Sequence, residues 1–184
     1  MLTHLRPAVV ILVLFTLLLG LAYPLAMTGV AQIAFPVQAS GSPLRDGDRL
    51  IGSALIGQAF TTEGYFPPRP SASSYDAMAS GGSNLGPLSQ KLMDRVTADL
   101  AALKAVGPMP ADAVTASASG LDPDISPANA LTQVARVAAA RNLPEDKLAA
   151  LITDHTSGRL FGLIGEPRVN VLALNLALDK LAAN

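Results

Sequence analysis

Hydrophobic positions are concentrated at the N-terminal end of the chain, where residues 8–26 read AVVILVLFTLLLGLAYPLA. No Asp, Glu, Lys or Arg occurs between Arg6 and Arg45. Because a helix rises about 1.5 Å per residue, roughly 20 apolar residues cross the hydrocarbon core of a bilayer. The pattern therefore predicts a transmembrane helix over residues 8–28, with a short N-terminus at 1–7 and a linker at 29–48.

A cleaved signal peptide is the alternative interpretation of this stretch. Gly29 and Ala31 satisfy the small-residue rule for cleavage, but the uncharged region continues through Phe35 and is longer than the core of a signal peptide. A buried helix of a soluble protein is disfavoured because this stretch is apolar on all faces. An uncleaved membrane anchor fits the pattern best.

The charges that flank the span predict its orientation. The amino terminus and Arg6 precede it, whereas the next cations, Arg45 and Arg49, are distant and lie among aspartates. Cationic flanks stay on the cytoplasmic side, so the N-terminus is expected inside and the rest of the chain outside. Small residues within the span are expected to permit close packing against another helix: Gly20, Ala22 and Ala26.

Beyond the linker, shorter periodic segments indicate one mixed α/β domain, helix-rich and of the α+β class, over residues 49–184. Residues 50–60 favour a short strand or a bent pair, because glycine within a strand marks a bulge or a close approach. Ser126 followed by Pro127 is typical of a helix N-cap and first helical residue. The remaining predicted elements are a strand at 111–118, helices at 127–141, 144–152 and 172–181, and a strand and turn within 160–171.

An amphipathic helix is predicted over residues 88–106, because its apolar positions recur at spacings of three and four and Gly107 then ends it. We expect this face to pack in the core of the domain; a partner helix is the alternative. Asp94, Arg95 and Asp99 fall on the other side and are expected in solvent. The apolar positions are Leu88, Leu92, Val96, Leu100, Leu103 and Val106.

Residues 61–87 form a long segment that is rich in Gly, Pro and Ser. Long connections in compact domains are commonly functional or disordered, and the aromatic residues in this one favour order. We expect an ordered loop presented to a partner, with packing on its own domain as the alternative. The partner-contact candidates are Tyr65, Phe66 and Arg69, residue types typical of interface anchors, with Ser83 and Asn84 as hydrogen-bond donors.

Composition excludes several classes of function. The 13 Lys and Arg residues nearly balance the 14 Asp and Glu residues, which argues against a nucleic-acid partner. Cysteine is absent and there are two histidines, so neither a thiolate nor a zinc cluster is predicted. Residues 81–86 lack the Lys of a P-loop, and residues 122–133 lack the Gly and Glu of a calcium loop. No cofactor or metal site and no catalytic residue is predicted.

An enzyme remains as the alternative class, in the form of an anchored serine hydrolase. A Ser–His pair using His155 or a Ser–Lys pair are the options that the composition leaves, but no G-x-S-x-G elbow is present. A stand-alone anchored binding module is a further alternative. The lysines available for a dyad are Lys91, Lys104, Lys147 and Lys180.

Six segments and the N-terminal span, taken in order, resemble the C-subunit family of the Kdp potassium-transporting P-type ATPases, KdpC. The resemblance covers nearly the whole chain. The segments are GSALIGQAF (52–60), YFPPRPSA (65–72), SGGSNLGP (80–87), TASASGLDPDISPANA (115–130), VARVAAARNL (134–143) and VNVLALNLALDKL (169–181).

The resemblance implies a non-catalytic subunit of an ATP-driven potassium uptake complex in a bacterial or archaeal plasma membrane. Its implied partners are a channel-like potassium-binding subunit, a P-type ATP-hydrolysing subunit, a small F subunit and membrane lipid. It also implies nucleotide binding, as a catalytic chaperone that raises the ATP affinity of the hydrolysing subunit. Because this chain has no nucleotide motif of its own and an expected external domain, assembly and stabilisation of the large subunits is the favoured role, with ATP and potassium bound through the complex.

Overall fold

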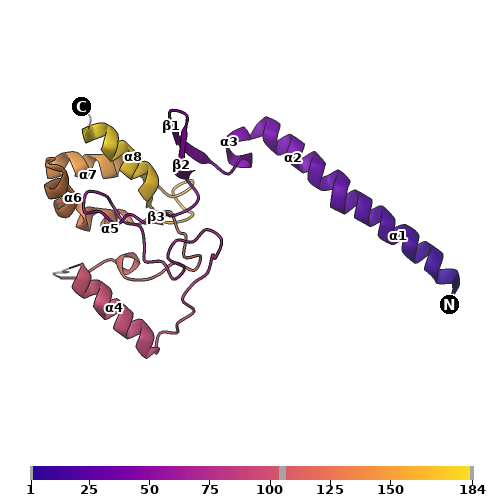
Figure 1. Ribbon diagram of the computed structural model, residues 1–184, viewed down its shortest axis with the longest axis horizontal. Coiled ribbons are helices and arrows are strands. Elements are labelled where there is room, and N and C mark those ends of the chain that lie inside the picture. Colours follow the sequence, from indigo (N-terminus) through magenta and orange to yellow (C-terminus); the bar gives the residue numbers. More distant parts are fainter. Residues whose placement is uncertain (1, 104–106, 183–184) are drawn as a thin grey trace. The chain divides into compact units, whose positions relative to one another are not determined.

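A computed structural model describes residues 2–103 and 107–182 (Figure 1). The described chain divides into two compact units at the bond between Ser53 and Ala54. The first unit holds the apolar N-terminal segment and a hairpin, and the second is a helix-rich α+β domain. This confirms the predicted combination of one apolar helix with such a domain.

A continuous helical segment, Leu5–Ala34, dominates the first unit and is the one candidate membrane span among the described residues. An 18-residue window within it has a mean hydropathy of 2.6, and no residue of that window is buried by protein. It consists of α1 (Leu5–Leu17), a π-helical turn η2 (Leu18–Ala22) and α2 (Tyr23–Ala34), after a 3₁₀ turn η1 (Leu2–His4). The π turn comes just before Pro24, which has no amide hydrogen to donate to the preceding turn.

The helix continues past the predicted end at residue 28, so residues 29–34 of the expected linker are helical. Nothing before Pro36 breaks the helix, and the residue preceding a proline is disfavoured in the helical region. Phe35 accordingly leaves the helix, with φ −140°. A short helix α3 (Pro36–Ala39) and an antiparallel hairpin, β1 (Pro43–Asp46) with β2 (Arg49–Ser53), complete the unit.

The predicted strand within residues 50–60 is confirmed in its first part, since β2 ends at Ser53. The register shifts between Leu44, which pairs with Gly52, and Arg45, which pairs with Leu50, so the extra residue of the bulge lies in β2 at Ile51, next to Gly52. From residue 54 the chain enters the second unit and runs without helix or strand as far as residue 89.

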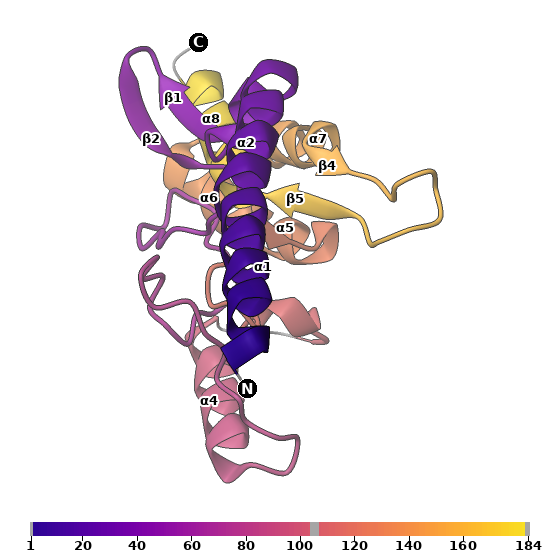
Figure 2. The same ribbon diagram turned by 90° about the vertical axis from the view of Figure 1, so that its right-hand side faces the viewer.

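Four helices and a three-stranded sheet build the core of the second unit (Figure 2). The helices are α5 (Pro127–Thr132), α6 (Val134–Arg141), α7 (Glu145–Asp154) and α8 (Val171–Ala182). The antiparallel sheet has the order β3 (Asp124–Ile125), β5 (Arg168–Asn170), β4 (Thr156–Ser157). The core cluster includes Ile125, Val137, Leu148, Ile152, Val169, Leu174 and Leu178, each at most 2% exposed.

Local signals place the boundaries of these helices as predicted. The Ser126 hydroxyl accepts a hydrogen bond from the Asn129 amide at 3.0 Å, and Pro127 occupies the first turn. Asn142 ends α6 in the left-handed conformation with φ +53°. The predicted 127–141 helix is divided at Gln133, which separates α5 from α6.

Two predictions for the middle of the chain are wrong. Residues 111–118 form a 3₁₀ turn, η3 (Ala111–Ala113), followed by loop, because the Thr115 hydroxyl donates to the Ala111 carbonyl and holds a turn where an extended strand was expected. Helix α4 (Gln90–Ala102) exists, but none of its side chains is buried, so its apolar face does not enter the core. Residues 104–106 of the predicted helix lie outside the described residues.

Candidate subunit-contact surface

The outermost part of the second unit is the segment 76–103, here called the α4 arm. Figure 1 shows α4 lying beside the α5–α8 group and outside it. Large apolar side chains along the arm are exposed to solvent: Met78 by 94%, Leu88 by 97%, Met93 by 58% and Leu103 by 43%. Single exposed apolar residues are ordinary, but a succession of them along one segment is typical of an interaction site.

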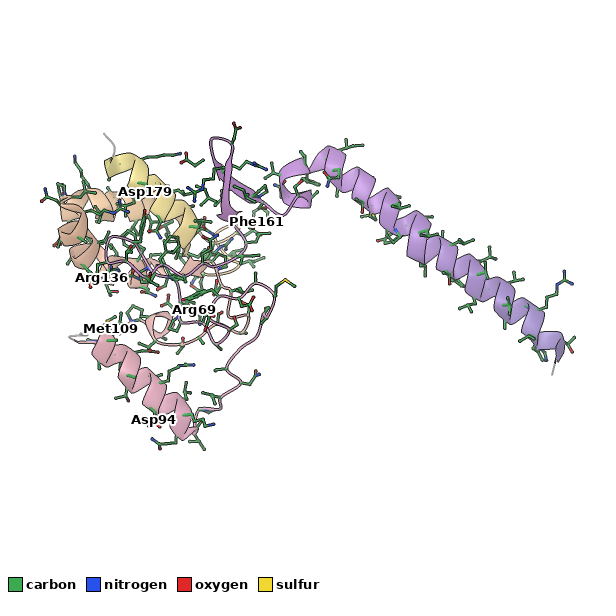
Figure 3. All side chains as sticks on the ribbon, viewed as in Figure 1. Arg69, Asp94, Met109, Arg136, Phe161 and Asp179 are labelled. Carbon is green, nitrogen blue, oxygen red and sulfur yellow. The ribbon has the colours of Figure 1, made fainter. Side chains whose placement is uncertain are left out.

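The polar residues of α4 also depart from the prediction. Arg95 and Asp99 were expected in solvent, yet their side chains are only 28% and 32% exposed, and Arg95 Nε lies 3.8 Å from Asp99 Oδ2. Asp94 is exposed, as predicted, and accepts a hydrogen bond from Gln90 (Figure 3). The half-buried face of α4 therefore combines the predicted apolar residues Leu92, Val96 and Leu100 with the Arg95–Asp99 pair.

A cavity of about 510 Å³ lies where the end of the α4 arm meets the long loop. Its lining combines apolar and polar groups from four separate segments. Burial lowers the pKa of the Arg136 guanidinium, and burial raises the pKa of the Tyr75 hydroxyl. The principal lining residues are Pro67, Pro68, Pro70, Tyr75, Leu103, Met109 and Arg136.

Tyr65 fixes the first part of the long loop to the C-terminal helix. Its hydroxyl donates to Asp179 Oδ2 at 3.1 Å, and the Arg141 guanidinium lies 4.3 Å from the centre of its ring. Arg141 also bonds Asp179 Oδ1 at 2.8 Å and the Gly64 carbonyl at 2.8 Å. Arg136 supports the same stretch by donating to the Tyr65 carbonyl at 3.1 Å (Figure 3).

Phe66 lies inside the core with no exposed surface. The Asn175 side chain of α8 clamps its backbone: Asn175 Oδ1 accepts from the Phe66 amide and Asn175 Nδ2 donates to the Phe66 carbonyl, both at 2.9 Å. Asn175 is itself 1% exposed. This arrangement favours the alternative of packing within the domain that the sequence left open for Phe66.

Arg69 joins three parts of the second unit. Its Nη1 bonds Asp122 Oδ2 at 3.1 Å, its Nη2 donates to the Thr115 carbonyl at 3.4 Å, and its own carbonyl accepts from the Tyr75 hydroxyl at 2.7 Å. The Arg69 side chain is 26% exposed. Part of the guanidinium therefore faces solvent while the rest holds the loop against residues 115–122.

Ser83 and Asn84 lie in the α4 arm, between its exposed residues Met78 and Leu88. Ser83 is half-buried, whereas Asn84 is exposed and adopts the left-handed conformation with φ +51°. The neighbouring Gly81 amide donates to the Ser119 carbonyl at 2.8 Å and attaches the base of the arm to the domain. These two of the five predicted contact residues thus belong to the exposed surface, while Tyr65, Phe66 and Arg69 lie in the network behind it.

The predicted helix-packing residues Gly20, Ala22 and Ala26 lie on the exposed surface of the apolar helix. A Cβ added at Gly20 would meet only Thr16 of its own helix, at 4.0 Å. The close approach of another helix at these positions stays a prediction.

A second cavity, of about 530 Å³, is lined mainly by charged residues. Arg69 and Asp122 contribute one ion pair, and Arg168 with Asp124 contributes another at 3.1 Å. Desolvation raises the pKa of Asp124 despite the opposing effects of Arg168 and a hydrogen bond from Asn170; Asp122 adds to the rise. The pairing neutralises most of the charge in this cavity, so we assign it a structural role.

The histidine proposed for a hydrolase is engaged with backbone. His155 Nδ1 lies 2.9 Å from the Leu151 carbonyl at the end of α7. Lys91 and Lys147 are exposed on α4 and α7, and Lys180 lies near the end of α8, whereas Lys104 lies outside the described residues.

The fold and this surface define a class of protein: one candidate membrane helix joined to a helix-rich α+β domain that leaves an apolar arm uncovered. The family model "KdpC: K+-transporting ATPase, c chain" matches residues 5–180. The chain belongs to the KdpC family, which confirms the resemblance drawn from the six segments.

Similar proteins from several bacteria carry the name "Potassium-transporting ATPase KdpC subunit". That of Allorhizobium ampelinum is 61% identical over 100% of this chain and 99% of its own length. That of Caulobacter vibrioides is 62% identical over 97% of this chain and 94% of its own, and that of Bradyrhizobium diazoefficiens is 54% identical over 100% of both. Membership makes the chain a subunit of a potassium-transporting ATPase.

Several residues of the supporting network were missed in the sequence. Asn175 is the only polar residue in the run VLALNLAL (171–178), and such an amide on a buried helix face needs a partner. That pattern indicates a buried hydrogen bond but not which backbone group supplies it. Arg141 and Asp179 gave no comparable signal, because charged residues at such positions are ordinarily solvated.

Proposed function

We propose that the chain is an accessory subunit that assembles and stabilises the channel-like and P-type subunits of the potassium-transporting ATPase, and that the α4 arm is its contact surface. The observation that carries the proposal is the exposure of Met78, Leu88 and Met93 in a chain of this family. A free monomer gains nothing from leaving these side chains in water, whereas a subunit interface covers them. The network behind the arm, including Tyr65 and Arg69, keeps its base in place.

Paired substitutions in the arm test the proposal. Leu88→Asp combined with Met93→Asp places two charges where an apolar interface is expected, so recovery of the other subunits with the tagged chain should fall strongly. Ala135→Asp combined with Ala140→Asp is the matched control, because it adds the same two charges at exposed helical positions of α6. Unchanged recovery with the paired variant, at wild-type thermal stability, would discard the arm as an interface.

We further propose that the N-terminus is cytoplasmic and the second unit extracytoplasmic. The basis is the placement of Arg6 before the span and the absence of nearby cations after it. Since the chain contains no cysteine, single cysteines can be labelled cleanly. Ser119→Cys and Ala140→Cys, at exposed positions outside the α4 arm, should react with an impermeant maleimide in intact spheroplasts. Reaction only after lysis would reverse the topology.

The family-implied role in ATP affinity is kept as a separate part of the proposal. An external domain acts on a cytoplasmic nucleotide site only through the subunits that it contacts. The paired arm variant therefore distinguishes two effects: lost subunit recovery reports assembly, and a raised KM for ATP in the complex that is still recovered reports coupling to the nucleotide site.

A further inference from the structure

A second exposed apolar feature lies far from the α4 arm in the sequence, in the loop that joins β4 to β5. Figure 2 shows this loop projecting from the body of the second unit. Residues 159–166, here called the apolar finger, read RLFGLIGE. Four large apolar side chains of the finger face solvent: Leu160 by 59%, Phe161 by 86%, Leu163 by 82% and Ile164 by 65%.

Four backbone amides of the finger donate hydrogen bonds within the finger itself. The Leu160 amide donates to the Ile164 carbonyl at 2.9 Å and the Ile164 amide donates back to the Leu160 carbonyl at 3.0 Å. The Leu163 amide also donates to Leu160, and the Gly162 amide to Arg159, both at 3.1 Å. Phe161 is in the left-handed conformation, with φ +53°, and its ring is the most exposed of the four apolar side chains.

Charge is confined to the base of the finger. Arg159 Nη2 bonds Glu166 Oε2 at 2.7 Å, and Arg168 Nε lies 3.1 Å from Asp124 Oδ2. The tip between Arg159 and Glu166 is therefore uncharged, while two guanidinium groups, 46% and 58% exposed, lie just behind it. An uncharged apolar tip whose flanking charges are paired with one another matches the acyl boundary of a membrane surface, where an unpaired charge would oppose insertion.

We propose that the apolar finger inserts its tip into the lipid surface of the bilayer that holds the chain. Two observations favour lipid over a protein partner. The four internally bonded amides lower the cost of entering a lipid layer, where no water replaces a missing hydrogen bond. The same chain also carries the candidate span, and residues 35–53 tether the second unit to it.

The inference rests on the proposed anchoring, and the experiment separates the two. The full chain carrying Phe161→Cys is labelled with a polarity-sensitive fluorophore and reconstituted into vesicles of phosphatidylethanolamine and phosphatidylglycerol. We expect blue-shifted emission, quenching by lipids with a nitroxide near the top of the acyl chain, and protection from aqueous iodide. Leu163→Cys should behave alike, and it avoids the left-handed position.

Met78→Cys, carrying the same fluorophore on the α4 arm, is the control for attraction of the label itself to lipid. It should stay accessible to iodide and free of quenching by the lipid nitroxide. Leu163→Asp, introduced into the Phe161→Cys chain, should abolish the lipid quenching because a charge at the tip opposes insertion.

Three results would overturn the inference. A labelled finger that iodide quenches as fully as the control is not in lipid. A finger that becomes shielded only when the other subunits of the complex are present docks on protein instead. A chain that fails to float with the vesicles refutes the anchor as well, whereas a floating chain with an aqueous finger refutes the finger alone.

Discussion

The α4 arm and the α5–α8 group contrast within one domain. Both show apolar residues at helical spacing, yet Val137, Leu148 and Leu174 are buried, whereas Leu92, Val96 and Leu100 of α4 are only half-buried. The α5–α8 group closes because the long loop is bonded to it: Asn175 of α8 accepts from the Phe66 amide, and Arg141 of α6 donates to the Gly64 carbonyl. The comparison teaches that an apolar repeat predicts a covered face without saying whether the same chain or another molecule covers it.

The largest expected effect on stability comes from truncating Phe66, the residue of the long loop that is buried in the core of the second unit. Phe66→Ala should lower the free energy of unfolding by about 3–5 kcal/mol, because it leaves a cavity in a site with no exposed surface. Met93→Ala on the arm should change it by no more than about 0.5 kcal/mol. Urea unfolding of the full chain in detergent, followed by circular dichroism, measures both. Equal losses would show that the arm is part of the folded core.

An intermediate effect is expected where the base of the arm meets residues 118–120. A Cβ at Gly120 would lie 2.5 Å from Ser73 Oγ and 2.7 Å from the Gly81 carbonyl, and the backbone has φ +66°. Gly120→Ala should therefore lower stability by about 1–3 kcal/mol. Gly86→Ala, with open space around its Cβ, is the matched control and should be neutral within about 1 kcal/mol. A neutral Gly120→Ala would mean that the arm is not tightly attached there.

The smallest expected effect is a pH dependence of the free energy of unfolding, and it arises in the second unit at Asp124. Desolvation raises the pKa of Asp124, so the folded protein binds this proton more tightly than the unfolded chain. Stability from this residue is therefore present at low pH and is lost as pH rises through the folded pKa. Asp124→Asn should leave the protein equally stable or more stable at neutral pH, by less than about 1 kcal/mol, since the Arg168 bridge is partly exposed.

The difference between parent and variant should shrink as the pH is lowered below the ordinary carboxylate range. Urea midpoints measured across the acid range check this sign. A variant that loses stability mainly at neutral pH would show that the ion pair with Arg168 outweighs the desolvation of Asp124.

Local signals in the sequence determined the parts of this protein that depend on neighbouring residues. The apolar run determined the long helix, and Pro36 determined where it ends. Ser126 with Pro127 determined the start of α5, and Asn142 determined the end of α6. These outcomes depend on local backbone stereochemistry and on the hydrophobicity of neighbouring residues. Residues far away in the chain therefore do not alter them. The six ordered segments likewise sufficed to indicate the family.

Only the tertiary structure decided which apolar faces meet. It buried Phe66 under Asn175, left α4 outside the core, replaced the expected strand at 111–118 by a 3₁₀ turn and exposed the apolar finger. Each of these outcomes depends on a competition between residues far apart in the chain, for buried area and for hydrogen-bond partners. A periodic pattern records that a side chain is apolar, but the free energy of its burial depends on the groups that the fold brings against it.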